Sequence, residues 1–319
     1  MTTPLAVLLA LALAAVVTAA VLNRATRRIA TEAERLVPRT GRVTPVAGGE
    51  IHWRAEGEGP TILCIHGLAG NLRDFTYALA PRLAAEGFRV VSLDRPGCGW
   101  SERPGEEAAR LPRQAAMIAE FMEAEGLSPA VVVGHSLGGA VALTLALEHP
   151  ERVAALALVA PLTAPMPDAP TVFKGLEVRT RRLREILAQT LAVPIAKRTG
   201  QATLRAVFAP EPPPEDFLVR GGGAFALRPK GFRCASEDLV AAGEGLPALA
   251  PRWATLNVPG GILYGEADAI LDPESQGRAA AERIPGFTLE TLPERGHMLP
   301  ITAPEETAAF VARLARAAG

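Results

Sequence analysis

The chain has 319 residues, of which 49% are hydrophobic and 21% are charged, and its formal net charge at pH 7 is −1. This length fits one large α/β domain with an insertion and does not require a separate second domain. The near-neutral charge and the lack of a basic, aromatic stripe argue against a nucleic-acid partner. The three cysteines, Cys64, Cys98 and Cys234, are far apart and odd in number. They argue against a disulfide framework and favour a reducing compartment, with Cys64 a core residue of a buried strand.

The N-terminal segment is strongly apolar. Residues 4–22 form a run interrupted only by Thr18, close to the roughly 20 residues that span a bilayer as a helix. Three arginines follow at positions 24, 27 and 28, which places the rest of the chain in the cytoplasm by the positive-inside rule. We therefore predict a single-pass transmembrane anchor over residues 1–23. A cleaved signal peptide is the alternative, because Ala19 and Ala20 are small, and the body would then be exported.

Strands and helices are expected to alternate along the body of the chain. After a charged helical linker over residues 24–42, we predict a hairpin over 43–54, strands over 61–65, 88–93, 131–133, 153–159, 260–265 and 287–292, and helices near 71–86, 110–125, 139–148 and 305–318. Such alternation favours a mostly parallel, doubly wound sheet with helices on both faces. The loops at the carboxyl ends of the strands are then the expected place for functional residues.

The pattern changes between residues 161 and 253, where proline clusters bracket a helical segment over residues 172–207. One side of this segment is apolar, with Leu183, Ile186, Leu187, Thr190 and Leu191; the other is basic, with Arg179, Arg181, Arg182, Arg184, Lys197, Arg198 and Arg205. We expect the apolar side to pack on the core and the basic side to face solvent. A second hypothesis is that this region also rests on an anionic membrane surface. Residues 221–223 are interpreted as a hinge or turn.

Residues 134–139, with the sequence GHSLGG, carry the strongest indication of chemistry. They follow an apolar run and precede a helix-like segment, so Ser136 stands in the strand-to-helix turn known as a nucleophile elbow. Such a turn is too tight for side chains at the flanking positions. Gly134 and Gly138 remove the collision and let the serine hydroxyl project from the end of the sheet.

A serine nucleophile needs a base, and we assign His297. It follows Gly296 in a loop after the apolar stretch 287–292, downstream of the serine. The other four histidines are set aside: His135 points away from the elbow, His66 belongs to another loop, and His52 and His149 are interpreted as surface residues. A carboxylate must orient the imidazole, and Asp268, in the loop after the 260–265 strand, is assigned that role. Asp272, which could instead cap the next helix, is held in reserve.

The oxyanion formed on acyl attack needs preorganised N–H donors. We expect one from Leu137, which follows the nucleophile, and one from Leu68 in the loop after the 61–65 strand. Gly67 gives that loop the freedom to turn its amides inward, and His66 is expected to support it by hydrogen bonding. No second ligand lies at metal-binding spacing from His66, so neither a metal nor an organic cofactor is predicted. Asp94 is expected to tie its own loop together through backbone bonds.

With these motifs, the chain resembles the α/β-hydrolase superfamily. The matching residues are His66 and Gly67, the stretch 94–101 (DRPGCGWS), the elbow 134–139, the stretch 265–268, and Gly296 and His297. The order Ser136, Asp268, His297 is the one that the superfamily uses. The resemblance implies an α/β-hydrolase fold with a helical cap: hydrolase core over residues 43–160 and 254–319, and cap over residues 161–253.

The resemblance implies a serine hydrolase, and the anchor places it at a membrane. We expect a membrane-anchored esterase or lipase-like enzyme that cleaves a lipophilic carboxylic ester, with a small-molecule or lipid ester as substrate. Two alternatives stay open. The same triad could serve acyl transfer, C–C bond hydrolysis or perhydrolysis, or the chain could be a non-catalytic, hydrolase-like binding protein. An elbow serine speaks against epoxide opening and halide displacement, for which the superfamily uses an aspartate.

Overall fold

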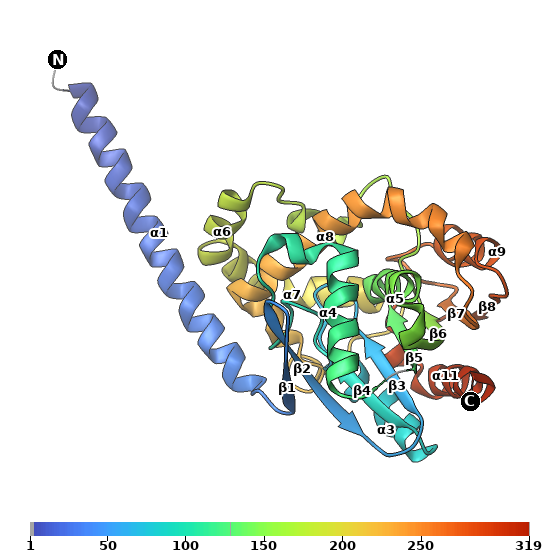
Figure 1. Ribbon diagram of the computed structural model, residues 1–319. Coiled ribbons are helices and arrows are strands. Elements are labelled where there is room, and N and C mark those ends of the chain that lie inside the picture. The colour runs from blue at the N-terminus through green and yellow to red at the C-terminus, as the bar shows by residue number, and fades with distance from the viewer. Residues whose placement is uncertain (1–2, 128, 319) are drawn as a thin grey trace.

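An eight-stranded sheet with the order β1-β2-β4-β3-β5-β6-β7-β8 forms the centre of the molecule (Figure 1). The computed structural model describes residues 3–127 and 129–318. The strands are β1 Arg42–Val46, β2 Gly49–Glu56, β3 Thr61–Ile65, β4 Arg89–Leu93, β5 Ala130–His135, β6 Val153–Val159, β7 Gly260–Gly265 and β8 Leu289–Leu292. β1 and β2 form the predicted hairpin, β2 runs antiparallel to β4, and all later neighbours are parallel. The predicted mostly parallel sheet is confirmed.

Both faces of the sheet are buried. Alternate residues of β3 point to opposite sides, so that Ile62 and Cys64 join one apolar cluster while Leu63 and Ile65 join another. Helices α3 Leu79–Ala85 and α11 Pro304–Ala318 cover the first cluster, and α4 Leu111–Ala124 and α5 Leu137–Glu148 cover the second. The remaining core segments are α2 Arg73–Thr76, α9 Ala279–Arg283 and α10 Leu299–Thr302, with short turns η1 Glu106–Ala109, η2 Pro150–Arg152, η5 Ala250–Thr255 and η6 Pro273–Arg278.

The helix expected near residues 71–86 is divided into α2 and α3. Pro81 explains the division. It has no N–H to donate to the Tyr77 carbonyl, and its ring would collide with that group in a continuous helix. A new helix therefore starts at Leu79, where Pro81 falls in the first turn and no intrahelical donor is needed.

The strand order creates a switch point beside β3. β3 pairs with β4 on one side and with β5 on the other. The chain therefore runs from β3 to β4 in one direction along the sheet and then crosses back past β3 to reach β5. In a parallel sheet the loops that leave the strands on either side of such a point diverge and open a crevice at the carboxyl edge. The loops after β3 and β5, which carry Leu68 and Ser136, meet there.

The segments predicted as an anchor and a linker form one helix, α1 Thr3–Leu36, which projects from the body (Figure 1). Within the described residues it is the one helix long and apolar enough to cross a membrane, and none of its most apolar window is buried. Its second half is held by the body. Asn23 and Thr26 donate side-chain hydrogen bonds to the carbonyls of Gln189 and Thr190, at 3.1 and 2.8 Å. The helix is therefore attached to the body within the stretch that carries Arg24, Arg27 and Arg28.

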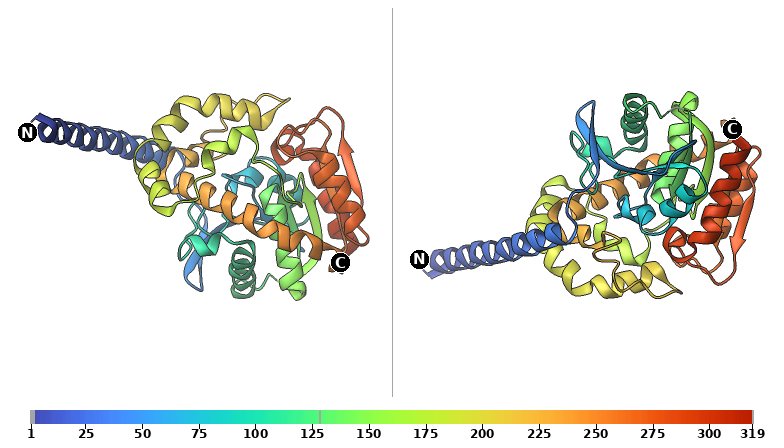
Figure 2. Two further views of the ribbon diagram at one scale, coloured as in Figure 1. Left: turned by 90° about the horizontal axis from the view of Figure 1, so that it is seen from above. Right: turned by 90° about the horizontal axis from the view of Figure 1, so that it is seen from below.

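Between β6 and β7 the chain forms a helical layer over the carboxyl edge of the sheet, seen from above and below in Figure 2. Its segments are η3 Thr171–Leu176, α6 Arg181–Gln189, α7 Ala192–Phe208, η4 Gly223–Leu227 and α8 Pro229–Leu249. The sequence indicated helix over residues 172–207 but gave no separate indication of α8, the longest helix of this layer. Gly222, in the predicted turn, has φ 74°, a conformation that glycine adopts without strain.

The expected orientation of α6 is wrong for Leu183, Ile186 and Arg184, although Arg181 and Arg182 are exposed as expected. Leu183, Ile186 and Leu191 are 48, 60 and 41% exposed, whereas Arg184 is buried at 3%. The Arg184 guanidinium turns inward because it finds partners there: Ser236 Oγ at 3.0 Å and Glu106 Oε2 at 2.7 Å. A buried guanidinium with its hydrogen bonds satisfied is tolerated, and the helix rotates its apolar residues outward as a result.

The cysteines also differ from expectation. Cys98, in the loop after β4, and Cys234, in α8, form a disulfide with Cα atoms 5.8 Å apart. A disulfide framework is indicated in a sequence by an even number of closely spaced cysteines. This chain has one bond between residues 136 positions apart, which such a pattern does not reveal. The cysteine-based argument for a reducing compartment therefore fails. Cys64 is buried as a free thiol in β3, as predicted.

Candidate active site

Ser136 stands in a strained turn between β5 and α5. Its φ and ψ are 54° and −124°, outside the regions that L-residues favour. The flanking glycines are required by space: a Cβ at Gly134 would lie 2.7 Å from the Gly138 carbonyl oxygen, and one at Gly138 would collide with the Ile65 carbonyl. The geometry is that of a nucleophile elbow, with the serine at the start of α5.

His297 and Asp268 form a buried pair. His297 Nδ1 lies 2.7 Å from Asp268 Oδ2, and the Asp268 side chain has no exposure. The other carboxylate oxygen accepts the backbone N–H groups of Ile270 and Leu271 at 2.8 and 3.0 Å. Because the carboxylate can only accept, Nδ1 carries the proton and Nε2 is left with a free lone pair. Asp272, the reserve acid, is exposed and caps the next turn by accepting Ser275 N–H.

The loop that carries His297 is attached to the turn at Ser136 through His135. His135 Nε2 lies 3.0 Å from the His297 carbonyl oxygen, and the two rings are 5.0 Å apart. Burial lowers the pKa of His135 to about 3, so the ring is neutral and donates its Nε2 proton to the carbonyl. Among the described residues, no hydrogen bond joins Ser136 Oγ to His297 itself. Contacts of that kind often shorten only when substrate binds.

The loop after β3 faces the serine. A Cβ at Gly67 would lie 2.9 Å from the Ser136 Cβ, so only glycine leaves room for the nucleophile. His66 supports the loop as expected: its Nε2 accepts the Arg95 N–H at 2.9 Å, which leaves Nδ1 protonated to donate to the Gly67 carbonyl at 2.8 Å. Burial, with the nearby Arg95 charge, lowers the pKa of His66 to about 3 and keeps the ring neutral.

Leu68, Ser136 and Leu137 line one small apolar cavity of about 30 Å³ beneath the cap. A larger cavity of about 390 Å³ lies between η3, α6, α7, η4 and α8 and reaches Ala69 and Gly70 of the same loop. Phe173 borders both cavities.

One residue, His52, has a role that the sequence did not indicate. His52 is not a surface residue: its ring is buried between Asp94 Oδ2 at 2.8 Å and the Thr40 carbonyl at 2.6 Å. Asp94 also accepts the N–H groups of Leu72 and Trp100, each at 2.8 Å, which is the loop-tying role expected of it. Burial raises the pKa of Asp94, but the His52 hydrogen bond and charge outweigh it and hold the pKa below its usual value.

One buried cluster has the atom types of a metal site: Cys98, Cys234 and Asp238. It does not suit a cation. The two sulfurs are bonded to each other, and the Asp238 carboxylate already pairs with Arg95 and Arg103 at 2.7 and 2.6 Å. A cation there would have to compete with two guanidinium groups for the single carboxylate.

The model of the alpha/beta hydrolase fold family matches residues 60–304. The pimeloyl-[acyl-carrier protein] methyl ester esterase of Chromobacterium violaceum is 32% identical over 76% of this chain and 88% of its own length. The 2-hydroxymuconate semialdehyde hydrolase of Pseudomonas putida is 28% identical over 86% and 93%. The chain spans less than a third of the length of several other curated relatives, which it matches over one segment.

A solved structure described as a membrane phospholipase A and bacterial virulence factor is 25% identical and superposes with a TM-score of 0.68. The match covers 99% of this chain and 98% of that one, so it includes the N-terminal helix. The family model covers most of the chain and agrees with the sheet, the elbow and the order of the motifs. The chain belongs to the alpha/beta hydrolase fold family.

Proposed function

We propose that this protein is a membrane-anchored serine hydrolase that cleaves lipophilic carboxylic esters through Ser136, His297 and Asp268. The observation that carries the proposal is the convergence of two pieces of chain. The elbow serine and the His297–Asp268 pair are held at one edge of the sheet through the His135 hydrogen bond, next to an apolar cavity.

The reaction follows from the proton positions. Ser136 Oγ attacks the ester carbonyl carbon while His297 Nε2 takes the hydroxyl proton, and Asp268 stabilises the resulting imidazolium. The N–H groups of Leu68 and Leu137 stabilise the oxyanion. When the tetrahedral intermediate collapses, His297 gives the proton to the leaving alkoxide and an acyl-enzyme remains. Water, deprotonated by His297, then releases the acid and restores the serine.

A lipophilic substrate is supported by the cap. The larger cavity is bordered mainly by aliphatic and aromatic side chains of α6, α7 and α8. Burial of apolar surface is worth about 25 cal/mol per Å², so an acyl chain there would gain binding energy in proportion to its length. The name of the structurally similar membrane phospholipase A points to the same class of ester.

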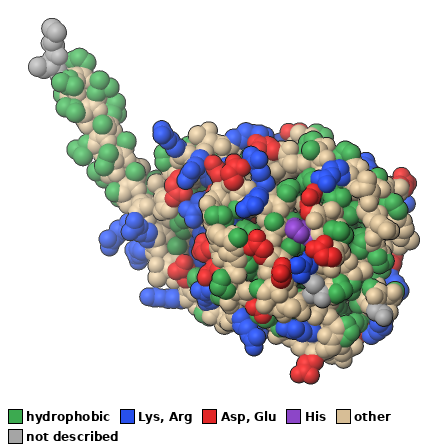
Figure 3. Space-filling view, viewed as in Figure 1, with side chains coloured by type: hydrophobic (Ala, Val, Ile, Leu, Met, Phe, Trp, Pro, Cys, Tyr) green, Lys and Arg blue, Asp and Glu red, His purple; other side chains and the backbone are tan. Residues whose placement is uncertain are grey.

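Membrane attachment is supported by two apolar surfaces on one side of the molecule. The exposed first part of α1 is one. The second, here named the outer cap patch, consists of Leu183 and Ile186 of α6, Leu191 between the helices and Ile195 of α7, which are 41–60% exposed. Leu191 and Ile195 also border the larger cavity. Basic side chains gather where α1 meets the body (Figure 3). Exposed apolar patches rimmed by basic groups suit the surface of an anionic bilayer.

Two observations point to different cellular compartments for the body of the protein. The arginines at positions 24, 27 and 28 favour a cytoplasmic body, whereas the Cys98–Cys234 bond favours an oxidising compartment. Protease digestion of spheroplasts distinguishes them, because only an exported body would be cut without lysis. A soluble product shortened by about 20 residues would instead show a cleaved signal peptide.

The function itself is tested on the full-length protein in detergent. We expect a fluorophosphonate probe to label Ser136, and p-nitrophenyl esters to be hydrolysed with a preference for longer acyl chains. Ser136→Ala should lose labelling and lower kcat by about 10⁴–10⁶-fold without unfolding. Equal ester hydrolysis by the variant would refute the proposal. Cleavage of a C–C bond in place of esters would favour the alternative of C–C bond hydrolysis by the same triad. Absence of labelling would favour a non-catalytic binding protein.

A further inference from the structure

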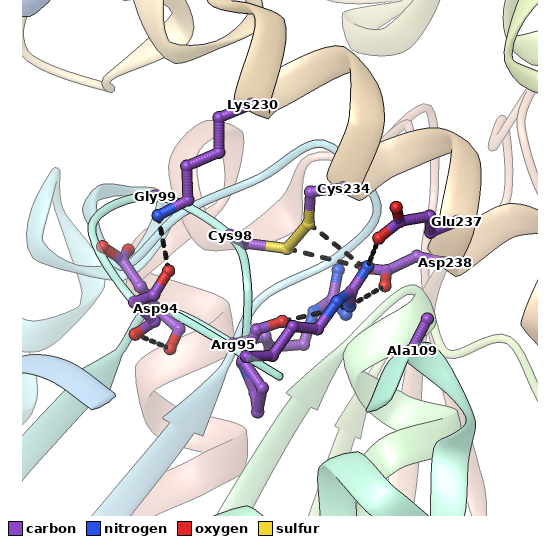
Figure 4. The surroundings of a disulfide bond; sticks show 12 residues. Asp94, Arg95, Cys98, Gly99, Ala109, Lys230, Cys234, Glu237 and Asp238 are labelled. Atoms are coloured by element: carbon purple, nitrogen blue, oxygen red, sulfur yellow. Dashed lines mark hydrogen bonds and ion pairs between the residues drawn. A yellow bond between two sulfur atoms is a disulfide. The ribbon is translucent and has the colours of Figure 1, made fainter. Parts of the chain in front are cut away.

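Arg95 links the cap to the loop that faces the nucleophile. It lies just after β4 and is fully buried. Its Nε donates to the His66 carbonyl at 2.9 Å and its Nη2 to the Gly67 carbonyl at 3.0 Å. Its Nη1 reaches the other way, to Asp238 Oδ2 of α8 and Gln114 Oε1 of α4, each at 2.7 Å. Figure 4 shows Arg95 beside Asp238 and the Cys98–Cys234 bond.

These contacts fix the direction of the Leu68 amide. In a planar trans peptide the C=O of residue 67 and the N–H of residue 68 point in opposite directions. The Gly67 carbonyl is held by two side-chain donors, Arg95 Nη2 and His66 Nδ1, and also accepts the Gly70 N–H at 3.3 Å. The Leu68 N–H must therefore point away from Arg95. Gly67 borders Ser136, and Leu68 lines the cavity that Ser136 also lines.

The guanidinium is itself held by the cap. The Asp238 carboxylate binds Arg95 through one oxygen and Arg103 through the other, and all three side chains are buried. Burial raises the pKa of Asp238, but the charges and hydrogen bonds of the two arginines outweigh it and hold the pKa below its usual value. Cys234 lies one helical turn before Asp238 and is bonded to Cys98, three residues after Arg95. The position of α8 is thus fixed to the Arg95 loop at two adjacent points.

We propose that Arg95 is a positioning residue for the oxyanion hole, and that cap helix α8 holds it in place through Asp238. The proposal rests on the proposed hydrolase function. It implies that the cap does more than enclose the substrate, because a shift of α8 would turn the Leu68 amide away from the site of the oxyanion.

The test compares two buried arginines that share one carboxylate. Arg95→Lys keeps the charge beside Asp238 but lacks the fork that binds two carbonyls. Arg103→Lys is the matched control: Arg103 binds Asp238, Glu237 and the Pro96 carbonyl, and among the described residues it has no hydrogen bond to residues 66–70. We expect Arg95→Lys to lower kcat by about 10²-fold with KM nearly unchanged, since an error of about 1 Å in a catalytic group costs that much. Arg103→Lys should leave kcat within about twofold of wild type.

A second measurement needs no turnover. Hydrogen exchange of the amides of residues 66–70 should become faster in Arg95→Lys and stay as in wild type in Arg103→Lys. Equal loss of kcat in both variants, or unchanged exchange in Arg95→Lys, would overturn the proposal. Failure of wild-type hydrolysis would contradict the proposed function alone, since the exchange comparison still decides the role of Arg95.

Asp238→Asn tests the cap link and replaces Arg95→Lys if that variant does not fold. It leaves the hydrogen bonds of Arg95 to the two carbonyls in place. It removes the negative charge with which α8 binds the Arg95 guanidinium. We expect a smaller fall in kcat than in Arg95→Lys, with KM unchanged and faster exchange of residues 66–70. Wild-type values for both kcat and exchange would show that α8 does not hold Arg95.

Discussion

His135 Nε2 donates to the backbone carbonyl of His297 at 3.0 Å, so the residue before the proposed nucleophile holds the loop of the proposed base. The bond is buried, and the neutral state of His135 makes it a simple donor. This contact joins two segments 162 residues apart in the sequence and brings Ser136 and His297 to one edge of the sheet.

His135→Leu should therefore damage both stability and turnover. The His297 carbonyl loses its partner while buried, which costs about 1–3 kcal/mol in the free energy of unfolding. The loosened loop should lower kcat more than it changes KM. Chemical denaturation and ester kinetics measure the two effects. His149→Gln, at the partly exposed end of α5, is the control and should change neither. An unaltered kcat in His135→Leu would show that the bond does not position the base.

The strained backbone of Ser136 leads to a second prediction. Its φ of 54° and ψ of −124° are available to glycine but costly for residues with a Cβ, typically by about 1–3 kcal/mol. Both Ser136→Gly and Ser136→Ala should be inactive, but Ser136→Gly should be more stable than Ser136→Ala by about 1 kcal/mol. Thermal unfolding of the two variants side by side checks this. A glycine variant less stable than the alanine variant would contradict the strain.

The outer cap patch should affect the hydrolysis of membrane-bound substrate and leave the hydrolysis of soluble substrate unchanged. Leu183→Ser/Ile186→Ser removes two exposed apolar side chains, each worth about 1.5–3 kcal/mol when buried in lipid. We expect hydrolysis of an ester embedded in anionic vesicles to fall at least about tenfold, and hydrolysis of a soluble short ester to stay at the wild-type rate. Arg181→Gln/Arg182→Gln is the companion variant that tests charge. Arg184 is unsuitable because it is buried. Equal loss on both substrates would remove the membrane role of the patch.

A buried acid gives a pH dependence with a defined sign. Burial raises the pKa of Asp74 from 3.8 to about 7, and the Asp94 charge adds to the increase. Between these values the folded protein keeps a proton that the unfolded chain releases, so this group makes stability fall as pH rises from about 4 to 7. Asp74→Asn should remove this contribution. Urea titrations at several pH values measure the free energy of unfolding of both proteins. The value for the variant minus the value for wild type should therefore increase as pH rises from about 4 to 7. A difference that is constant with pH would contradict the raised pKa.

The disulfide should contribute to the stability of the folded body. Cys98→Ser/Cys234→Ser opens a link across 136 residues and should lower the free energy of unfolding by about 2–4 kcal/mol. Wild-type protein treated with reductant should reach the same value. Cys64→Ala, which leaves the bond intact, should keep its sensitivity to reductant. Wild-type stability that does not respond to reductant would show that the bond is not formed in solution.

The sequence was most informative where local patterns decide the structure. The strands 61–65 and 153–159 were predicted to the residue because short β-rich apolar runs bounded by turn residues have few alternatives. The nucleophile elbow could be recognised in the sequence because the tight turn requires glycines at fixed positions around the serine. Asp268 was preferred over Asp272, and the structure pairs it with His297, although spacing alone did not separate them.

The errors arose where distant segments meet. Arg184 faces inward because Ser236 and Glu106 receive it, and His52 is buried because Asp94 and Thr40 accept its two ring nitrogens. The Cys98–Cys234 bond depends on α8 lying over the loop after β4. None of these partners is near in sequence to the residue it contacts, except Thr40 to His52. Hydrophobic periodicity describes one helix or strand at a time and contains no information on tertiary contacts between distant segments.

The unbroken course of α1 has a mechanical consequence. Nineteen residues from Pro4 to Leu22 rise about 28 Å, nearly the thickness of a bilayer's hydrocarbon layer. In the proposed membrane-anchored arrangement, Asn23 and Thr26, which donate hydrogen bonds to the end of α6, would lie at the height of the lipid headgroups. A flexible tether would let the body rotate freely above the lipids. In that arrangement, a continuous helix bonded to the body at that height would instead favour one tilt and one depth, so that the same cap surface would face the lipids.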